Sequence, residues 1–337
     1  MKTAAVIGVG GMVGRAVARA LEAHGYSVRG AQRRAAPIQG LVTASLDRED
    51  TASLRAFSAG ADVLVDVVAY DASHGRQLAE LASDVGGIVV ISTGSVYADG
   101  QGRSFDVTTG DHDYPSFPVP IDESQPMIAA GDGYGARKAA LERVVSSITA
   151  APVTILRAAA VHGPYATRLR EWYFIKRSLD RRPHVVFARG GRSVFSTIAA
   201  DNLAELVALA AEQPGHRVLN AADAPLTISE MATIAFQALE TDVRILHFEG
   251  PKRGLLGNNP WDAAHPFVQA ADRARTELGY APIVDYAESV LRERDWVLAE
   301  IAGGRDWGEL FPSVIERHGR GGWFPYELED AWIAGLA

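Results

Sequence analysis

The chain has 337 residues, of which 33 are Lys or Arg and 41 are Asp or Glu, so its net charge is −8. This length is enough for two domains or one large α/β unit, and 47% hydrophobic with 22% charged residues is typical of a soluble globular protein. The acidic balance argues against a nucleic acid or an anionic membrane as partner, because either would need a basic surface.

Cysteine is absent, which excludes disulfides, thiolate metal sites and a Cys nucleophile. It also fits a reducing compartment, so we expect a cytoplasmic protein. The first residues read as a strand rather than a signal peptide, and no apolar run is long enough to predict a transmembrane helix. The nine His residues form no HExxH pattern, and we predict no metal site.

Short apolar runs alternate with helical patterns along much of the chain. This alternation predicts a Rossmann-type doubly wound parallel sheet, with a smaller, mixed C-terminal substrate domain. The helix that begins at Thr227 should carry a capping box with Glu230. The expected strands are 3–9, 26–31, 41–45, 63–69, 88–92, 153–156 and 218–220, and the other expected helices are 12–24, 136–147 and 200–211.

The expected dinucleotide-binding domain covers residues 1–162 and is completed by about 193–222. Residues 163–192 and 223–337 then form the substrate-binding region. Within the first domain, residues 98–133 are rich in Gly, Asp, Pro and Ser, and a loop of this length is more often functional or mobile than structural. Five of the six Trp residues lie in the last third of the chain, where they either pack the C-terminal segment or line the substrate cleft.

Glycines separate the first expected strand from the first expected helix. Gly8, Gly11 and Gly14 form G-x-x-G-x-x-G, a turn that lets the backbone approach a pyrophosphate at a helix N-terminus. The alternative is a plain tight turn. We expect cofactor contacts here and at the end of the 63–69 strand, from Gly8, Gly10, Gly11, Met12, Val13, Gly14, Val68 and Ala69.

The end of the second expected strand indicates which cofactor is used. An acidic residue usually stands there when the ribose 2′-OH is bound, but this chain has Gln32, Arg33 and Arg34, with Arg29 close by. Guanidinium groups suit a 2′-phosphate, so we predict NADP(H) over NAD(H), the alternative being a solvated basic turn. Asp47, after the third strand, is a candidate for binding the adenine amino group.

Tyr134 and Lys138 form Y-x-x-x-K at an expected helix start. Their i, i+4 spacing puts both side chains on one helix face. A nearby ammonium group lowers the pKa of a tyrosine, which suits a phenol that acts as acid or base on an alcohol or a carbonyl. Upstream, the 88–92 strand runs into Ser92, Thr93 and Ser95, whose hydroxyls would face the ligand crevice.

These motifs together resemble those of the extended short-chain dehydrogenase/reductases, the NAD(P)-dependent epimerase/dehydratase family. The resemblance rests on VIGVGGMVG, VLVDVVAY, ISTGSVY, YGARKAALE, LRAAAVHGP and DRARTELGY, which span residues 4–280. It implies that Thr93 is the catalytic hydroxyl, with Ser92 and Ser95 as competitors, that Tyr134 is the acid/base and that Lys138 is its partner. It also implies a homodimer paired through the helix that carries Tyr134 and Lys138.

Three positions depart from the pattern of the nucleotide-sugar members. Ala160 stands where those members carry an Asn, with His162 in place of a Tyr, and Val194 stands where they carry a diphosphate-binding Arg. We expect substrate contacts from Ser95, His162 and Arg168. The alternative for His162 is a structural His, and the alternative for Arg168 is a solvated helix start.

The leading hypothesis is an NADP(H)-dependent oxidoreductase that interconverts a secondary alcohol and a ketone on a small molecule. The first alternative is a sugar or nucleotide-sugar epimerase or dehydratase that recycles its cofactor within each turnover. The dehydratase option is weakened because Gly94 and Ser95, rather than carboxylates, follow Thr93. An alternative of another class is a cofactor-sensing regulatory protein, which would not need an acid/base set.

Overall fold

The computed structural model describes residues 1–34, 38 and 40–336, which divide into two compact units. Unit 1 comprises Met1–Val161, Ala200–Asp223 and Gln269–Ile283, and unit 2 comprises His162–Ala199, Ala224–Val268 and Val284–Ala337. The structure differs from the expected division at residues 269–283, which the sequence patterns assign to the substrate-binding region. This segment belongs to unit 1 because α8 (Asp272–Leu278) packs against β10 (Arg217–Ala221).

Unit 1 is built on a sheet of seven strands in the order β10-β6-β5-β4-β1-β2-β3. Every neighbouring pair is parallel, which confirms the predicted Rossmann-type sheet. The strands other than β10 are β1 (Thr3–Ile7), β2 (Ser27–Gln32), β3 (Val42–Ser45), β4 (Val63–Asp66), β5 (Ile88–Thr93) and β6 (Val153–Ala158).

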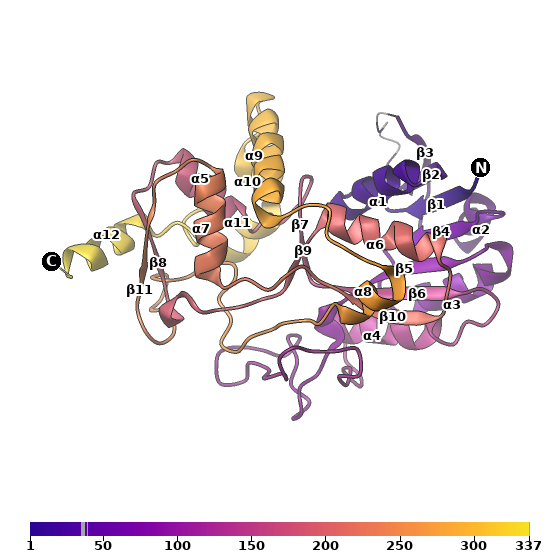
Figure 1. Ribbon diagram of the computed structural model, residues 1–337, viewed down its shortest axis with the longest axis horizontal. Coiled ribbons are helices and arrows are strands. Elements are labelled where there is room, and N and C mark those ends of the chain that lie inside the picture. The colour runs from indigo at the N-terminus through magenta and orange to yellow at the C-terminus, as the bar shows by residue number, and fades with distance from the viewer. Residues whose placement is uncertain (35–37, 39, 337) are drawn as a thin grey trace. The chain divides into compact units, whose positions relative to one another are not determined.

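Helices cover both faces of this sheet (Figure 1). On one face α1 (Met12–Ala23) packs against α6 (Ala200–Glu212), and on the other α3 (Ala72–Leu81) packs against α4 (Tyr134–Val145). The central strands β4 and β5 are therefore buried along their whole length, as their continuous apolar runs predict. The remaining helical segments of unit 1 are α2 (Thr51–Ser58), η1 (Ala82–Asp84) and η2 (Gly94–Val96).

Strand β4 ends three residues before the expected end at residue 69. The reason is Asp66, whose carboxylate accepts hydrogen bonds from the amides of Val68 (3.0 Å) and Ala69 (2.8 Å). A short polar side chain that bonds to the following amides turns the chain out of the sheet. Asp66 is itself buried and pairs with Arg48 at 2.7 Å.

The long segment 98–133 is organised around one buried carboxylate. Asp99 accepts hydrogen bonds from the backbone amides of Gln101, Arg103 and Ser116. Burial raises its pKa, but these amides and the Arg103 guanidinium outweigh that effect and lower the pKa to about 2. Asp99 therefore ties together parts of the loop that lie up to 17 residues apart.

Unit 2 pairs β8 (His184–Phe187) with β11 (Arg244–His247) in parallel. Helix α7 (Ile228–Ala238) packs on α5 (Trp172–Leu179) and α9 (Tyr286–Ala302). The capping box of Thr227 and Glu230 is confirmed. The other elements are β7 (Ala160–His162), which crosses the unit boundary, η3 (Arg189–Gly191), β9 (Thr197–Ala199), α10 (Trp307–Leu310), α11 (Pro312–His318) and α12 (Tyr326–Ala334).

The C-terminal tryptophans make aromatic contacts within unit 2. Trp307 contacts Trp172, Trp296 contacts Phe311, and Trp332 contacts Phe248. Trp261 and Trp323 are buried. These contacts support the packing interpretation of the Trp-rich segment. Among the described residues, no helix is both long and apolar enough to cross a membrane.

Candidate active site

The glycine turn lies between the end of β1 and the start of α1. Gly8 has φ +92°, and a Cβ on Gly14 would lie 2.2 Å from the Gly8 carbonyl oxygen, so neither position suits a side chain. Gly11 caps α1 without any side-chain hydrogen bond. The first amides of α1 are thus left for an anion, and this turn fits the pyrophosphate of a nicotinamide dinucleotide.

Two predicted cofactor residues border this turn. A Cβ on Gly10 would lie 2.1 Å from Gln32 Oε1, and one on Gly8 would lie 2.5 Å from Val68 Cγ1. Met12 and Val13 form the first turn of α1. The structure therefore brings the ends of β1, β2 and β4 together at the turn, as the sequence spacing predicts.

Arg29, within β2, and Arg33 and Arg34, just after it, do not form one cluster. Arg33 and Arg34 are exposed, and residues 35–37 after them lie outside the described part of the chain. Arg29, by contrast, donates to the Ala59 carbonyl at 2.7 Å and stacks on the Phe57 ring. Arg29 is thus no member of a basic cluster with Arg33 and Arg34.

Asp47 lies in the turn that follows β3. It is exposed, and its Oδ1 accepts a hydrogen bond from the Glu49 amide at 3.0 Å. One of its carboxylate oxygens is therefore engaged with the backbone. Binding of an adenine amino group by Asp47 stays a prediction.

Thr93, at the end of β5, and Tyr134, at the start of α4, form a hydroxyl pair. Thr93 Oγ1 accepts from the Ser95 amide at 3.1 Å. Tyr134 is 45% exposed, but its phenol group is desolvated, and this burial raises its pKa above 10 although the Thr93 hydroxyl bonds to it and lowers the pKa. The structure therefore places these two predicted catalytic hydroxyls near each other, at the end of β5 and the start of α4.

Lys138 lies one turn after Tyr134 but does not interact with it. Its Nζ donates to the carbonyls of Ala69 (2.6 Å) and Ile91 (2.8 Å), and burial lowers its pKa to about 8. The expectation that the ammonium group lowers the pKa of Tyr134 is wrong for this structure, because the side chain points to these two carbonyls. Lys138 here links α4 to the ends of β4 and β5.

Of the two competing hydroxyls, Ser92 is engaged elsewhere. It donates to Glu142, two turns after Tyr134 on α4, and Glu142 also binds Arg157 of β6 at 2.8 Å. All three side chains are buried. Ser95 is partly buried, and a Cβ on Gly135 would lie 2.1 Å from its carbonyl oxygen, so η2 packs directly on the start of α4. Thr93 is the hydroxyl that faces Tyr134.

Asp106, from the long loop, caps the helix that carries Tyr134. Its two carboxylate oxygens accept from the amides of Gly135 and Ala136, both at 2.8 Å, which is the usual role of an N-terminal carboxylate. Its charge also raises the pKa of Tyr134. Sequence reasoning missed Asp106 because it lies 28 residues upstream of Tyr134, where no local pattern marks a cap.

Tyr70, after β4, is a second residue that the sequence did not single out. Its ring lies 5.8 Å from that of Tyr134. The Arg137 guanidinium lies 4.5 Å from the Tyr70 ring centroid and pairs with Asp71 at 2.8 Å. This pair orients the aromatic surface beside the phenol.

The predicted substrate residues His162 and Arg168 both lie in unit 2. His162 is buried, and its Nδ1 lies 3.0 Å from Glu293 Oε1 and 3.0 Å from Ser289 Oγ. This placement favours the structural alternative for His162. Arg168 is partly buried, and burial together with the charges of Arg170 and Arg317 lowers its pKa to about 10.

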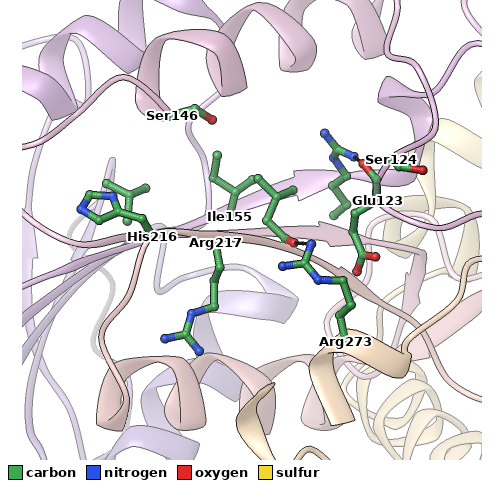
Figure 2. A pocket seen from close by; sticks show the side chains of 10 residues that line it. Glu123, Ser124, Ser146, Ile155, His216, Arg217 and Arg273 are labelled. Carbon is green, nitrogen blue, oxygen red and sulfur yellow. Dashed lines mark hydrogen bonds between the residues drawn. The ribbon is translucent and has the colours of Figure 1, made fainter. Parts of the chain in front are cut away.

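A separate cavity of about 510 Å³ opens in unit 1 beside β6 and β10 (Figure 2). Its arginines are largely used for internal bonds: Arg273 donates to the Val218 carbonyl, and Arg217 to the Gln213 carbonyl. None of the predicted catalytic residues lines it. It is lined by Glu123, Ser124, Ser146, Val153, Ile155, Arg157, His216, Arg217, Val218 and Arg273.

A parallel Rossmann-type sheet with a glycine turn, and a Thr–Tyr–Lys set on β5 and α4, define an enzyme of the extended short-chain dehydrogenase/reductase type. The profile of the NAD dependent epimerase/dehydratase family matches residues 4–222. The chain therefore belongs to this family. No curated protein matches it significantly in sequence.

Solved epimerases share the fold. A UDP-glucose-4-epimerase from Stenotrophomonas maltophila is 17% identical, with a TM-score of 0.69 over 90% of this chain and 100% of that one. A UDP-N-acetylglucosamine 4-epimerase from Bacillus cereus is 18% identical (TM-score 0.68, 89% and 100%). An epimerase from Methanothermobacter thermautotrophicus is 17% identical (TM-score 0.67, 89% and 93%).

Proposed function

We propose that this protein is an epimerase that inverts a secondary alcohol carbon of a small molecule and regains its cofactor within each turnover. The placement of Thr93 at the end of β5 and of Tyr134 at the start of α4, close enough for the Thr93 hydroxyl to affect the pKa of Tyr134, carries the proposal. Membership of the epimerase/dehydratase family favours this reaction over net oxidation or reduction. Gly94 and Ser95, in place of carboxylates after Thr93, favour epimerase over dehydratase.

Tyr134 transfers the proton in this mechanism. Its raised pKa keeps the phenol protonated at neutral pH, the form that donates to a carbonyl oxygen. The oxidising half-reaction comes first and needs the phenolate to accept the proton of the substrate hydroxyl; the Thr93 hydroxyl, which lowers the pKa of Tyr134, favours that form. A nicotinamide cofactor held by the glycine turn would supply the hydride acceptor and donor. Asp106 and Lys138 hold the helix that presents Tyr134.

The stoichiometry of the cofactor tests this proposal. The full chain is supplied with nucleotide sugars and simpler secondary alcohols in excess over a limiting amount of NAD(H) or NADP(H). We expect many molecules of inverted product per cofactor molecule, with no lasting change in absorbance at 340 nm. Product formed one for one with consumed cofactor would instead establish the second candidate, a net oxidoreductase.

The second candidate has its own support in the substrate positions. Ala160 and Val194 replace the Asn and Arg of the nucleotide-sugar pattern, so a substrate without a diphosphate fits the sequence equally well. A non-catalytic sensor is disfavoured, because it would not need an acid/base set such as Thr93 and Tyr134, which lie near each other at one edge of the sheet.

We further propose that the cofactor is NADP(H). One neighbour, the S. maltophila epimerase, has bound NAD, but Gln32 stands where an acid would bind the ribose, and exposed Arg33 and Arg34 follow it. Replacing both arginines with Ala should weaken NADPH binding by about 10- to 100-fold, the loss of one or two charge-assisted hydrogen bonds. NADH binding should change less than twofold.

Equilibrium titrations of both reduced cofactors measure this preference. The matched control is Arg29→Ala, which removes an arginine from the same strand that is bonded to Ala59 and should leave the ratio of affinities unchanged. An NADPH/NADH ratio that survives the double substitution would rule out the role of Arg33 and Arg34.

A further inference from the structure

A buried His–Glu–Glu cluster lies inside unit 2, outside the proposed catalytic machinery. It consists of His162 at the end of β7, Glu171 just before α5, and Glu293 in α9, and these three residues are at most 2% exposed. One potential ligand atom of each residue lies within 4.8 Å of those of the other two. Two acidic residues and an imidazole are rarely buried together unless something balances their charge.

The cluster is short of hydrogen-bond partners in the described part of the chain. Both carboxylate oxygens of Glu171 lack one, as do Glu293 Oε2 and His162 Nε2. The Tyr286 hydroxyl faces Glu171, but outside the geometry of a hydrogen bond. Buried polar atoms are nearly always satisfied, so these atoms point to a missing partner.

A proton shared between the two carboxylates does not account for this arrangement. A shared proton would draw the two carboxyl groups into a short hydrogen bond, whereas neither oxygen of Glu171 has such a bond. His162 and, to a smaller extent, Arg170 are the positive groups that lower the pKa of Glu171, and the Arg170 guanidinium lies 4.9 Å from the Trp261 ring centroid. The potential ligand atoms of the three residues lie close enough together for one ion to contact all three.

The distances suit a metal ion. Metal–nitrogen and metal–oxygen bonds of about 2.0–2.2 Å place neighbouring ligand atoms roughly 3.0–3.5 Å apart. His162 Nδ1 and Glu293 Oε1 form a hydrogen-bonded ion pair at 3.0 Å, a separation that also fits two ligands of one ion. Glu171 lies further away, but no hydrogen bond holds its carboxylate in place. Its side chain can therefore move to bind an ion.

We propose that His162, Glu171 and Glu293 bind one divalent transition-metal ion, of the Zn²⁺, Mn²⁺ or Co²⁺ class. Two carboxylates cancel the charge of such an ion, and an imidazole ligand favours these metals over Mg²⁺ or Ca²⁺. Because the ligands come from β7, the start of α5 and α9, the ion joins three elements of unit 2 and stabilises it. No sequence motif marks this site, because its ligands are spread over 131 residues.

Metal content and thermal stability of the full chain test this site. The purified protein is dialysed against chelator, loaded with Zn²⁺, Mn²⁺ or Co²⁺, exchanged into metal-free buffer and analysed for bound metal. We expect one ion per chain and a rise in the unfolding midpoint on loading. Glu171→Gln keeps the shape of the side chain and removes its charge, so it should fold, yet lose both the ion and the rise. His162→Gln should in addition alter the visible spectrum of bound Co²⁺.

A partly exposed set of the same residue types provides the matched control. His24 in unit 1 lies 3.1 Å from Glu205 and 3.0 Å from Glu212, and His24→Gln should retain the ion. The proposal is overturned if the wild-type chain binds none of the three metals. Protonation of the buried carboxyl groups would then be what neutralises the cluster. It is also overturned if His24→Gln loses the ion while Glu171→Gln retains it.

Discussion

Replacing Tyr134 with Phe should lower kcat by about 10²- to 10⁴-fold, the usual contribution of a positioned acid/base group. The ring, and with it the contact to Tyr70, is kept, while the proton that passes to and from the substrate oxygen is lost. Cofactor affinity should change less than twofold, because the glycine turn is untouched. Steady-state rates and cofactor titrations on the same preparation measure both effects.

Tyr26→Phe is the control for this substitution. Tyr26 is a buried tyrosine just before β2, and removal of its hydroxyl should leave kcat within twofold. If Tyr134→Phe turned over substrate as fast as the wild type, Tyr134 would not be the acid/base and the assignment would pass to another group.

Glu142→Ala should destabilise the protein by about 3–5 kcal/mol, the cost of leaving a buried charge without its partner. Glu142 of α4 accepts hydrogen bonds from Ser92 of β5 and from Arg157 of β6. Burial lowers the pKa of Arg157, but Glu142 outweighs this effect and holds the pKa above its usual value. Without Glu142 the guanidinium stays charged in the core, so the thermal midpoint of the full chain should fall by several degrees.

An exposed pair of the same residue types isolates the effect of burial. Glu277 pairs with Arg273 on α8 at 2.7 Å and is partly exposed, so Glu277→Ala should change stability by less than about 1 kcal/mol. Equal losses in the two variants would mean that the buried pair is not what fastens α4 to the sheet.

Periodic patterns along the chain predict the sheet of unit 1 well. The runs at β4 and β5 are continuous because both faces are covered, and the glycine turn marks the passage from β1 to α1. The end of β4 was misplaced, since Asp66 takes up the amides that would have continued the strand. The segment 269–283 was assigned to the wrong region because its place beside β10 depends on tertiary packing.

The candidate site likewise contains residues that the sequence patterns predict and residues that they do not. Tyr134 is predicted from its spacing to Lys138 and Thr93 from the family resemblance, and the structure places both at the same edge of the sheet, because strand ends and helix starts meet there in a parallel sheet. Asp106 and Tyr70 also lie beside Tyr134, but they come from loops, which have no periodic pattern that could predict this. The orientation of Lys138 toward two carbonyls likewise depends on tertiary packing, which the sequence pattern does not predict.

Cofactor binding at the glycine turn tests the account most directly. Gly11→Ala should fold normally, because its Cβ would meet only the Gly8 oxygen at 3.8 Å, but the added methyl group lies at the approach to the first amides of α1. Gly87→Ala, with a nearest contact of 3.7 Å, is the control. We predict one nicotinamide dinucleotide per wild-type and Gly87→Ala chain, and at least about tenfold weaker binding to Gly11→Ala. Equal affinity in all three proteins, or no binding to the wild type, would contradict the account.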